Sequence, residues 1–305
     1  MRYKIIVNPV SGRGAGERAI SQIEDHLKRN GLEFDLVRSE RPWHAADLAC
    51  QAAQAGYDVV VAAGGDGTVN EVINGLMQAK ESGSKPSALG VLCIGRGNDF
   101  AYGVGIPTDI PLGCSTLARA RRTALDIGKV HGGDYPDGRF FGNGVGIGFD
   151  AVVGFEALKM KRLHGFISYL VAAIKTIFLY YKAPKVRIQF DSQELEIKAL
   201  MVSVMNGRRM GGGFMMAPFA LTDDSLFDLC IASQISRIKI FAMIPKFMRG
   251  SQAEDASIRT LQTRCVTVTD LEGVLPSHSD GETLCIAGKS LTLEIHPHQL
   301  EIIRP

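Results

Sequence analysis

The first 130 residues of the chain alternate between two hydrophobic patterns. Short apolar runs, several of them rich in β-branched residues, occupy residues 4–7, 34–37, 59–62, 89–94 and 124–130. Between these runs, helical patterns cover residues 19–27, 45–55, 69–77 and 110–121. Short strands that alternate with helices are typical of a parallel sheet with helices on both faces.

The pattern changes after Val130. A long helical stretch follows at residues 151–181, and another helix is expected at residues 236–249. The other apolar runs predict strands at residues 186–190, 195–204, 227–232, 265–269 and 291–295. We therefore predict an α/β plus β architecture. A Rossmann-like α/β domain covers residues 1–128, and a mainly antiparallel β-sandwich domain covers residues 129–305.

Composition narrows the class of protein. The 305 residues are 46% hydrophobic and 22% charged, and their formal net charge of +2 gives no indication of a nucleic-acid partner. No two of the six cysteines form a C-x-x-C pair, which fits a reducing cytosol. No apolar window is long enough to span a bilayer, and the nearest approach, residues 166–181, contains Lys175. We predict a cytoplasmic protein whose membrane contact is peripheral.

A glycine-rich loop stands where the third predicted strand meets the third predicted helix, and it reads Gly64-Gly65-Asp66-Gly67-Thr68. Glycines let the backbone approach an anion, and the start of a helix supplies N–H donors. A carboxylate in such a loop repels bare phosphate, so it makes sense if it holds a phosphate-bound Mg²⁺ or orders the loop. The same residues also fit a tight strand–helix turn capped by the threonine.

Two further loops strengthen the case for a ligand site. Residues 8–14 (N-P-V-S-G-R-G) follow the first strand, and residues 95–100 (G-R-G-N-D-F) follow the fourth. Loops at the carboxyl ends of parallel strands line one edge of a sheet, where ligands bind in α/β proteins. Turn chemistry alone does not account for three such loops.

The common nucleotide fingerprints are absent. Residues 12–17 lack the third glycine of G-x-G-x-x-G, and the second strand ends in Arg38-Ser39 instead of an acid for the ribose of NAD. Gly288-Lys289-Ser290 has a threonine where a P-loop begins with glycine. We therefore expect neither an ordinary Rossmann dehydrogenase nor a P-loop NTPase.

Taken together, the motifs resemble those of the bacterial diacylglycerol kinases and YegS-like lipid kinases, relatives of sphingosine and ceramide kinases. The first domain carries N-P-x-S-G from Asn8, G-G-D-G-T-x-N-E from Gly64, N-D-F-A from Asn98 and D-I-G from Asp126. The second carries D-D-x-x-x-D at residues 223–228 and D-G-E at residues 280–282. NAD kinases and phosphofructokinases share versions of G-G-D-G-T, so its combination with D-G-E and the glycine-rich loop at residues 206–214 is the more specific signal.

The resemblance implies a two-domain fold with the nucleotide in the cleft between the domains, and transfer of the ATP γ-phosphate to a lipid hydroxyl. It gives the base chemistry to Asp280 and Glu282. It implies a structural Mg²⁺ held by Asp224 and the backbone carbonyls of Leu221 and Leu226, supported by Asp99 and Asp126. By position, the residues around the nucleotide are Asn8, Pro9, Val10, Ser11, Gly12, Ser39, Gly64, Gly65, Asp66, Gly67, Thr68, Val69, Asn70 and Arg96.

One position departs from the resemblance. Relatives usually carry Gly-Thr or Gly-Ser where this chain has Gly95-Arg96. An arginine can pair with a phosphate and strengthen binding, or it can fill space meant for the nucleotide. The sequence leaves both alternatives open.

The D-G-E segment also leaves a choice open. A carboxylate that takes the proton of the acceptor hydroxyl would help a poor nucleophile. If the segment is extended, Asp280 and Glu282 face the same side, and if it turns at Gly281 they diverge. The sequence does not decide which is the base, and without the resemblance a polar turn between two strands is favoured.

The acidic stretch that contains Asp223, Asp224 and Asp228 offers hard oxygen ligands suited to Mg²⁺ or Ca²⁺. The alternative is an acidic turn before a strand. No glutamate closes a twelve-residue loop, which excludes an EF-hand. The pair His296-x-His298 favours a solvated strand end over a zinc site.

Two features concern the acceptor. Eight of the ten methionines fall between Met160 and Met248, and four of them surround the glycines of the loop at residues 206–214. Such a loop suits the mouth of an acyl-chain pocket, although ordinary core filling explains it as well. A basic cluster before the apolar stretch suits an anionic membrane surface, and a buried helix with a solvated start is the alternative. The cluster consists of Lys159, Lys161, Arg162 and His164.

These observations leave three hypotheses for the function. The first is an ATP- and Mg²⁺-dependent lipid kinase whose partners are ATP and a lipid at a membrane surface. The second is a soluble-substrate kinase such as an NAD kinase, and the third is a non-catalytic lipid or nucleotide binder. The oligomeric state is open, with a homodimer as one candidate.

Overall fold

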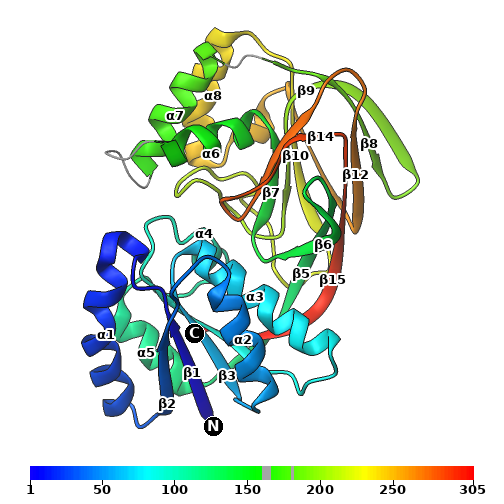
Figure 1. The fold of residues 1–305 in the computed structure, drawn as a ribbon. Coiled ribbons are helices and arrows are strands. Elements are labelled where there is room, and N and C mark those ends of the chain that lie inside the picture. Colours follow the sequence, from blue (N-terminus) through cyan, green and yellow to red (C-terminus); the bar gives the residue numbers. More distant parts are fainter. Residues whose placement is uncertain (160–165, 180–181) are drawn as a thin grey trace. The chain divides into compact units, whose positions relative to one another are not determined.

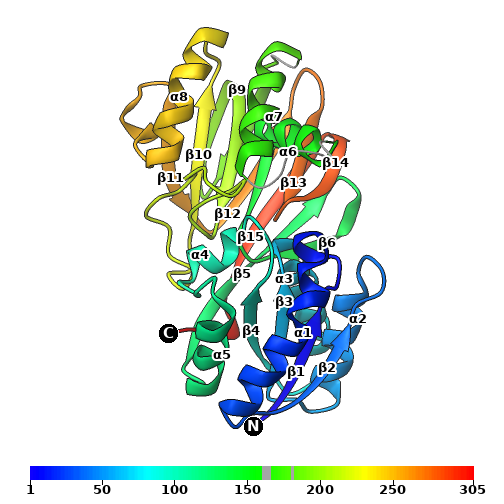
Figure 2. The ribbon, with the colours of Figure 1, turned by 90° about the vertical axis from the view of Figure 1, so that its left-hand side faces the viewer.

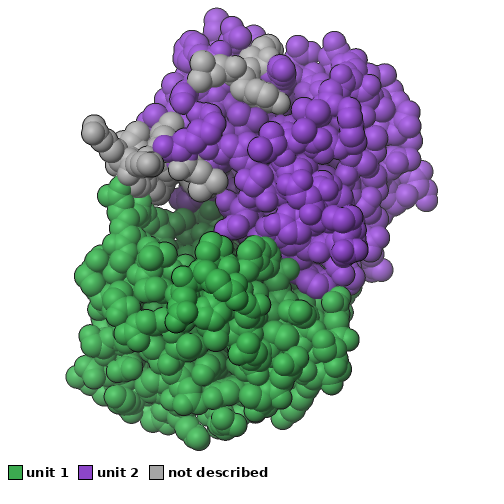
Figure 3. Space-filling view, in the orientation of Figure 1, with its two compact units in different colours: residues 1–127, 297–305 green, residues 128–296 purple. Residues whose placement is uncertain are grey.

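The computed structural model describes residues 1–159, 166–179 and 182–305. They form two compact units, coloured separately in Figure 3. Unit 1 contains Met1–Ile127 and Pro297–Pro305, and unit 2 contains Gly128–His296. The chain thus changes unit next to the predicted boundary at residue 128, but its last nine residues, predicted to lie in the second domain, belong to unit 1.

Unit 1 is built on a parallel sheet with the strand order β2-β1-β3-β4-β15. β3 and β4 are buried along their whole length, as expected for central strands covered on both faces. The first four strands are β1 (Arg2–Val7), β2 (Glu33–Arg38), β3 (Val59–Gly64) and β4 (Ala88–Cys93).

Helices cover both faces of this sheet, which confirms the predicted α/β arrangement. Figure 1 shows α1 (Ser11–Arg29) and α5 (Ile110–Arg119) on one face, and α2 (His44–Gln54) and α3 (Asp66–Glu81) on the other. Ile23 and Leu27 of α1 pack with the alternate apolar residues of β1 and β3 that point to their face. The remaining short helix of this unit is α4 (Asp99–Gly103).

The fifth apolar run does not join the parallel sheet as predicted. β5 (Arg122–Gly132) pairs with β15 (Ser290–Ile303) and, in antiparallel register, with β6 (Tyr135–Phe141). The place beside β4 is taken by the end of β15, where Ile302 is aligned with Leu89. An apolar run shows that a strand is buried but not which strand it pairs with, so the sequence pattern did not distinguish the two arrangements.

Unit 2 is a β-sandwich whose two antiparallel sheets share the long strand β9 (Gln193–Met205). The first part of β9 pairs with β8 (Lys185–Phe190), and the second part pairs with β7 (Gly144–Gly148) and β10 (Phe227–Ser233). β12 (Cys265–Asp270) and β15 extend the first sheet. The second sheet continues with β11 (Ile258–Thr263), β13 (Leu275–Ser279) and β14 (Glu282–Gly288).

The core of unit 2 lies between the two sheets. Apolar side chains from both sheets form one buried cluster, in which the rings of Phe141 and Phe227 stack at 5.5 Å between centroids. This packing confirms the predicted β-rich second fold.

Helices cover the other face of the sheet that contains β7, β9 and β10. They are α6 (Phe149–Lys159), α7 (Phe166–Leu179) and α8 (Arg237–Arg249), followed by a short 3₁₀ turn at Gln252–Glu254 (Figure 2). Their inner faces form a second apolar cluster with Leu200, Met201 and Met205 of β9. α8 begins after Ser236, whose hydroxyl accepts the Lys239 N–H as an N-cap.

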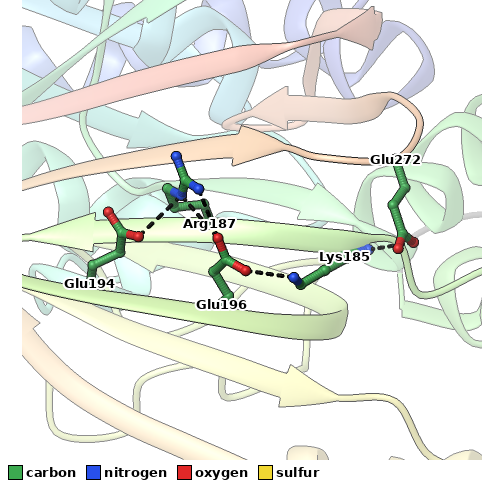
Figure 4. A network of polar contacts seen from close by, with 5 residues as sticks. All are labelled: Lys185, Arg187, Glu194, Glu196 and Glu272. Carbon is green, nitrogen blue, oxygen red and sulfur yellow. Dashed lines mark hydrogen bonds and ion pairs between the residues drawn. The ribbon is translucent and has the colours of Figure 1, made fainter.

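The β8–β9 hairpin carries ion pairs on its solvent side. Arg187 pairs with Glu194 and Glu196, and Lys185 pairs with Glu196 (Figure 4). The carboxylate of Glu272 accepts the backbone N–H of Lys185. Exposed pairs of this kind contribute about 0–1 kcal/mol each, so this network mainly marks the face of the hairpin that stays in water.

Candidate functional site

The three loops singled out in the sequence meet at one edge of the sheet of unit 1. A Cβ built on Gly65 would lie 3.1 Å from the Cα of Gly95, and one on Gly12 would lie 2.5 Å from the carbonyl oxygen of Ile94. The N–H of Ile94 donates to the carbonyl of Gly64 at 2.8 Å. Glycine is therefore needed where these backbones approach one another.

Side chains also join the loops. The Asn8 amide donates to the hydroxyl of Thr68 at 3.0 Å, so the threonine links two loops and does not cap α3. Asp66 accepts the backbone N–H of Phe100 at 3.0 Å, at the start of α4. This hydrogen bond ties the glycine-rich loop to the loop after β4, and the Mg²⁺ role of Asp66 stays a prediction.

The predicted nucleotide residues of unit 1 differ in how far they are exposed to solvent. Val69 and Asn70 are buried in α3, and Ser39 is buried at the end of β2, where its N–H donates to Val7. Arg96 is exposed and makes no hydrogen bond or ion pair with any residue in the described part of the chain. The loop positions Asn8, Pro9, Ser11, Gly12, Gly65, Asp66 and Gly67 are part-buried, Val10 is exposed, and Gly64 and Thr68 are buried.

The D-G-E segment turns sharply, so its two carboxylates diverge. Asp280 and Gly281, with φ of 49° and 86°, form the two-residue turn of the β13–β14 hairpin. Asp280 is buried, whereas the side chain of Glu282 is 46% exposed. The two acids therefore have different environments.

The carboxylate of Asp280 holds the turn between β6 and β7. It accepts the backbone N–H groups of Gly144 at 2.8 Å, Gly142 at 3.0 Å and Asn143 at 3.1 Å. The Asn206 amide donates to the carbonyl of Gly142 at 2.8 Å, which adds the glycine-rich loop to the same assembly. Buried side chains thus connect segments that are far apart in the sequence.

Glu282 lies beside a buried cation. The guanidinium of Arg139 is 2% exposed and lies 3.9 Å from the Glu282 carboxylate. It also donates to the hydroxyl of Tyr135 at 3.1 Å.

The predicted metal residues form a turn before β10. The N–H of Leu226 donates to Asp224 at 3.1 Å, Ser225 has a φ of 66°, and Leu221 is exposed. Burial, and secondarily the Asp224 charge, raises the pKa of the Asp228 carboxyl, whose Gln262 hydrogen bond opposes the shift. In the described residues, the buried Oδ2 of Asp228 has no hydrogen-bond partner.

The predicted supporting acids lie in unit 1. Asp126 is fully buried and accepts the backbone N–H of His298 at 2.7 Å, which joins β5 to β15. Asp99 is buried at the start of α4.

Unit 2 contains an apolar cavity of about 90 Å³ between the helices and the sheet. One water molecule needs about 10–15 Å³ by this measure, so the cavity has room for several atoms the size of a water molecule. The glycine-rich loop contributes Met210, Gly211 and Phe214 to its wall, and Met216 follows just after the loop. Both methionines also belong to the buried apolar cluster, so they fit the pocket interpretation and ordinary core filling alike.

Two polar side chains also line this cavity, and the sequence reasoning missed both. Burial raises the pKa of the Asp150 carboxyl to about 7, against hydrogen bonds from Ser203 and from backbone N–H groups. Burial lowers the pKa of His278 to about 4, and in the described residues its Nδ1 has no partner. The two groups are close together, because a Cβ on Gly146 would lie within 2.4 Å of His278 Nε2 and 2.5 Å of Asp150 Oδ2.

The predicted basic cluster is described only in part. Lys159 is exposed and pairs with Glu156 at 2.7 Å. Lys161, Arg162 and His164 lie outside the described residues. Within the described ranges, no helix is both long enough and apolar enough to cross a bilayer.

Two family models cover most of the chain. One, described as the diacylglycerol kinase catalytic domain, matches residues 2–130. The other, described as the YegS C-terminal NAD kinase β-sandwich-like domain, matches residues 143–304. Their order along the chain is that of the α/β and β-rich parts of the fold.

Curated relatives cover the whole chain. A diacylglycerol kinase of Staphylococcus saprophyticus is 28% identical over 308 residues, which span 100% of this chain and 95% of that protein. A diacylglycerol kinase of Mycobacterium tuberculosis is 27% identical over 303 residues, which span 98% and 94%.

Solved structures share the fold at lower identity. The crystal structure of a diacylglycerol kinase from Bacillus anthracis has a TM-score of 0.76 at 21% identity and covers 100% of this chain and 97% of that one. An NAD kinase from Archaeoglobus fulgidus in complex with ATP has a TM-score of 0.52 at 13% identity, with coverages of 100% and 94%. At these identities, the likeness concerns the fold alone.

Proposed function

The chain belongs to the family of bacterial diacylglycerol kinases and YegS-like lipid kinases, and from this premise we propose that it transfers the γ-phosphate of ATP to a lipid hydroxyl such as that of diacylglycerol. The observation that carries the proposal is the convergence of three loops at the carboxyl edge of the sheet of unit 1. Ligands of open α/β sheets bind at this edge.

We assign the ATP phosphates to these loops and to the first turn of α3. The close approach of Gly12, Gly65 and Gly95 leaves backbone without side chains at this edge, which is the kind of surface that phosphate oxygens approach. The N–H groups of the first helical turn have no acceptor within the helix. Arg96 is exposed and not engaged by other described residues, which favours a phosphate-pairing role for it.

We assign the general base to Glu282 and a positioning role to Asp280. Both oxygens of Asp280 already accept backbone hydrogen bonds, so its protonation would disrupt the turn at residues 142–144. Glu282 is half exposed, and the turn at residues 142–144 does not depend on its carboxylate. In the proposed step, the acceptor O–H proton passes to Glu282 and the oxygen bonds to the γ-phosphorus. The bond to the β-phosphate oxygen breaks, and ADP leaves with its electrons.

We assign a structural Mg²⁺ to the turn that contains Asp224. The donor set fits a hard cation, because it combines carboxylate and carbonyl oxygens and includes the unpartnered Oδ2 of Asp228. No three His, Cys, Asp or Glu side chains converge on a metal-sized site among the described residues, so the carbonyls of Leu221 and Leu226 would complete the set. The bound cation would neutralise the two carboxylates and fix the turn.

We assign the acyl part of the acceptor to the cavity of unit 2. Its wall is almost entirely apolar, and the flexible side chains of Met210 and Met216 can adapt to an irregular chain. The lipid would be met at a membrane surface by a cytoplasmic protein that binds there peripherally.

Incubation of the protein with γ-labelled ATP, Mg²⁺, diacylglycerol and NAD tests the proposed function. We expect label in a product that extracts into organic solvent and depends on the lipid. Label only in NADP would instead support the NAD kinase hypothesis, for which the present support is a shared fold. ATP binding without transfer to any acceptor would contradict both kinase hypotheses.

A further inference from the structure

The outer faces of α7 and α8 are apolar. On α8, Ile238 is 83% exposed, and the exposed stripe continues through Phe241, Ala242, Pro245 and Met248. The inner face of the same helix is apolar too, with Ile240, Met243 and Phe247 buried. A helix that is apolar on both faces is not fully satisfied by packing on one side.

α7 extends this apolar face. Phe178 is 63% exposed, and Ile167 and Ile174 are also exposed. The Phe178 ring contacts the Phe241 ring of α8 at 5.8 Å between centroids, and the two helices are in contact. Figure 2 shows them both at the same end of unit 2. We call this the α7–α8 surface, and it consists of Ile167, Ile174, Phe178, Ile238, Phe241 and Met248.

The charged side chains of α7 and α8 themselves have one sign. Neither helix contains an acidic residue within its bounds. Arg237 and Arg249 lie at the two ends of the exposed stripe of α8. The lysines lie at its margins and pair with acids on neighbouring segments: Lys175 with Glu156, and Lys239 and Lys246 with Asp255.

The same two helices separate this surface from the cavity of unit 2. Ala173 of α7 and Ile240, Met243 and Phe247 of α8 line the cavity. An apolar molecule in contact with the outer face therefore lies one helix layer from the apolar interior.

We propose that the α7–α8 surface docks on an anionic lipid bilayer, with its apolar side chains among the outermost acyl segments and its arginines at the phosphate level. Exposed apolar side chains flanked by cations are the chemistry of interfacial helices. A second copy of the chain fits less well, because a twofold contact would bring the cations of both copies together, while the nearby acids Glu156 and Asp255 already pair with lysines of their own chain. The docking itself does not depend on the proposed function. Its purpose does, because we infer that docking brings the lipid acceptor to the cavity.

Co-sedimentation with vesicles tests the proposal. The vesicles contain phosphatidylcholine alone, or equal parts of phosphatidylcholine and phosphatidylglycerol. We expect the wild type to bind the anionic vesicles, and Ile238→Glu and Phe178→Glu each to weaken that binding by about tenfold, since an apolar group is lost and a repelled charge is gained. Ile286→Glu is the matched control, because Ile286 is 72% exposed on β14 of the same unit.

Charge variants test the second half of the proposal. Arg237→Gln and Arg249→Gln should each weaken binding to anionic vesicles by about fivefold and leave binding to phosphatidylcholine unchanged. Unchanged anionic binding in Ile238→Glu and Phe178→Glu, or an equal loss in Ile286→Glu, would overturn the proposal. So would sedimentation equilibrium that shows a dimer dissolved by Ile238→Glu while vesicle binding persists. Thermal unfolding of each variant shows whether the fold is intact.

An activity assay separates this inference from the proposed function. A short-chain diacylglycerol dissolved as monomers needs no docking, so Ile238→Glu should phosphorylate it at the wild-type rate and lose activity only on vesicles. If the wild type phosphorylates neither acceptor while vesicle binding responds as expected, the proposed function fails and the docking surface stands. Equal losses on monomeric and vesicular acceptor would contradict docking as the role of this face.

Discussion

The two units build their candidate sites in opposite ways. In unit 1, each loop is one continuous segment after one strand, and the parallel register of β1, β3 and β4 brings the loops to the same edge. In unit 2, the site joins turns at residues 142–144, 206–214 and 280–282, which are held by buried side chains such as Asp280 and Asn206. The first site depends on the close approach of backbone segments, and the second on hydrogen bonds made by buried polar side chains.

The two sites are therefore sensitive to different kinds of substitution. Substitutions at the loop edge of unit 1, to which we assign the ATP phosphates, should change binding through charge or crowding. They should have little effect on the free energy of unfolding when the side chain is exposed. Substitutions inside the unit 2 network should act on stability, because a buried N–H without an acceptor costs about 1–3 kcal/mol. Glu282 is the exception in unit 2. Its side chain is half exposed, so a substitution there should change activity and not stability.

Glu282→Gln should have the largest effect. Loss of a general base typically lowers kcat by about 10²- to 10⁴-fold, while the urea unfolding curve should stay that of the wild type because the side chain is half exposed. Steady-state kinetics with ATP and diacylglycerol measure the first effect. Glu194→Gln, on the exposed hairpin of the same unit, is the control and should keep full activity. Full activity in Glu282→Gln would remove the base assignment.

Asp280→Ala should destabilise unit 2 by about 3–5 kcal/mol, since three buried N–H donors lose their acceptor at once. Urea denaturation monitored by far-UV circular dichroism measures the change. Asp280→Asn should cost less, because the amide oxygen still accepts hydrogen bonds from the turn. A wild-type midpoint for Asp280→Ala would mean that the network does not hold the turn.

The cavity residues should give opposite pH dependences. Asp150 has a folded pKa raised from 3.8 to about 7, so its stabilising contribution is complete below about pH 4 and is lost as the pH rises to 7. His278 has a folded pKa lowered from 6.5 to about 4, so its contribution is present above pH 6.5 and is lost as the pH falls to 4.

Asp150→Asn should therefore gain stability relative to the wild type as the pH rises from 4 to 7, by on the order of 4 kcal/mol at about 1.4 kcal/mol per pKa unit. His278→Asn should gain relative stability as the pH falls from 6.5 to 4, by about 3 kcal/mol. Free energies of unfolding across this range measure both. Parallel stability–pH curves for each variant and the wild type would show that these groups are not buried as described.

Arg96→Ser should have the smallest effect of the four. Loss of one charge-assisted contact to a phosphate should weaken ATP binding by about tenfold, or 1.4 kcal/mol. Isothermal titration with ATP measures the dissociation constant, and Arg29→Ser, an exposed arginine at the end of α1, is the matched control. Tighter ATP binding in Arg96→Ser would show instead that the arginine fills nucleotide space.

The sequence predicted where the three loops of unit 1 meet, because the information for that prediction is local. Each loop can be identified by its glycines next to a buried apolar run. The parallel pairing of the strands then determines where the loops meet. The sequence missed β13, Leu275–Ser279, because its polar residues are all buried and show no alternation. It left Asp280 and Glu282 unresolved, although Asp280-Gly281 is the two-residue signal of a tight hairpin, which separates the two acids.

Asp150 and His278 were missed for a different reason. Their chemistry depends on burial, and burial of a single polar residue is set by segments distant in sequence, here β9, α8 and the glycine-rich loop. Gly144, Gly146 and Gly148 give a weak indication of this site. They alternate along the chain, which indicates a strand with one face closely approached by large side chains. Gly146 indeed lies under both polar groups.

The pairing of β15 with β4 has a consequence for synthesis on the ribosome. About 200 residues separate Leu89 from its partner Ile302, so translation at about 5–20 residues per second leaves one edge of β4 without that partner for roughly 10–40 seconds. The waiting edge belongs to a wholly apolar strand, Ala88–Cys93, of the kind that pairs with other chains when exposed. The nascent chain should therefore depend on chaperones most during the interval in which unit 2 is being made.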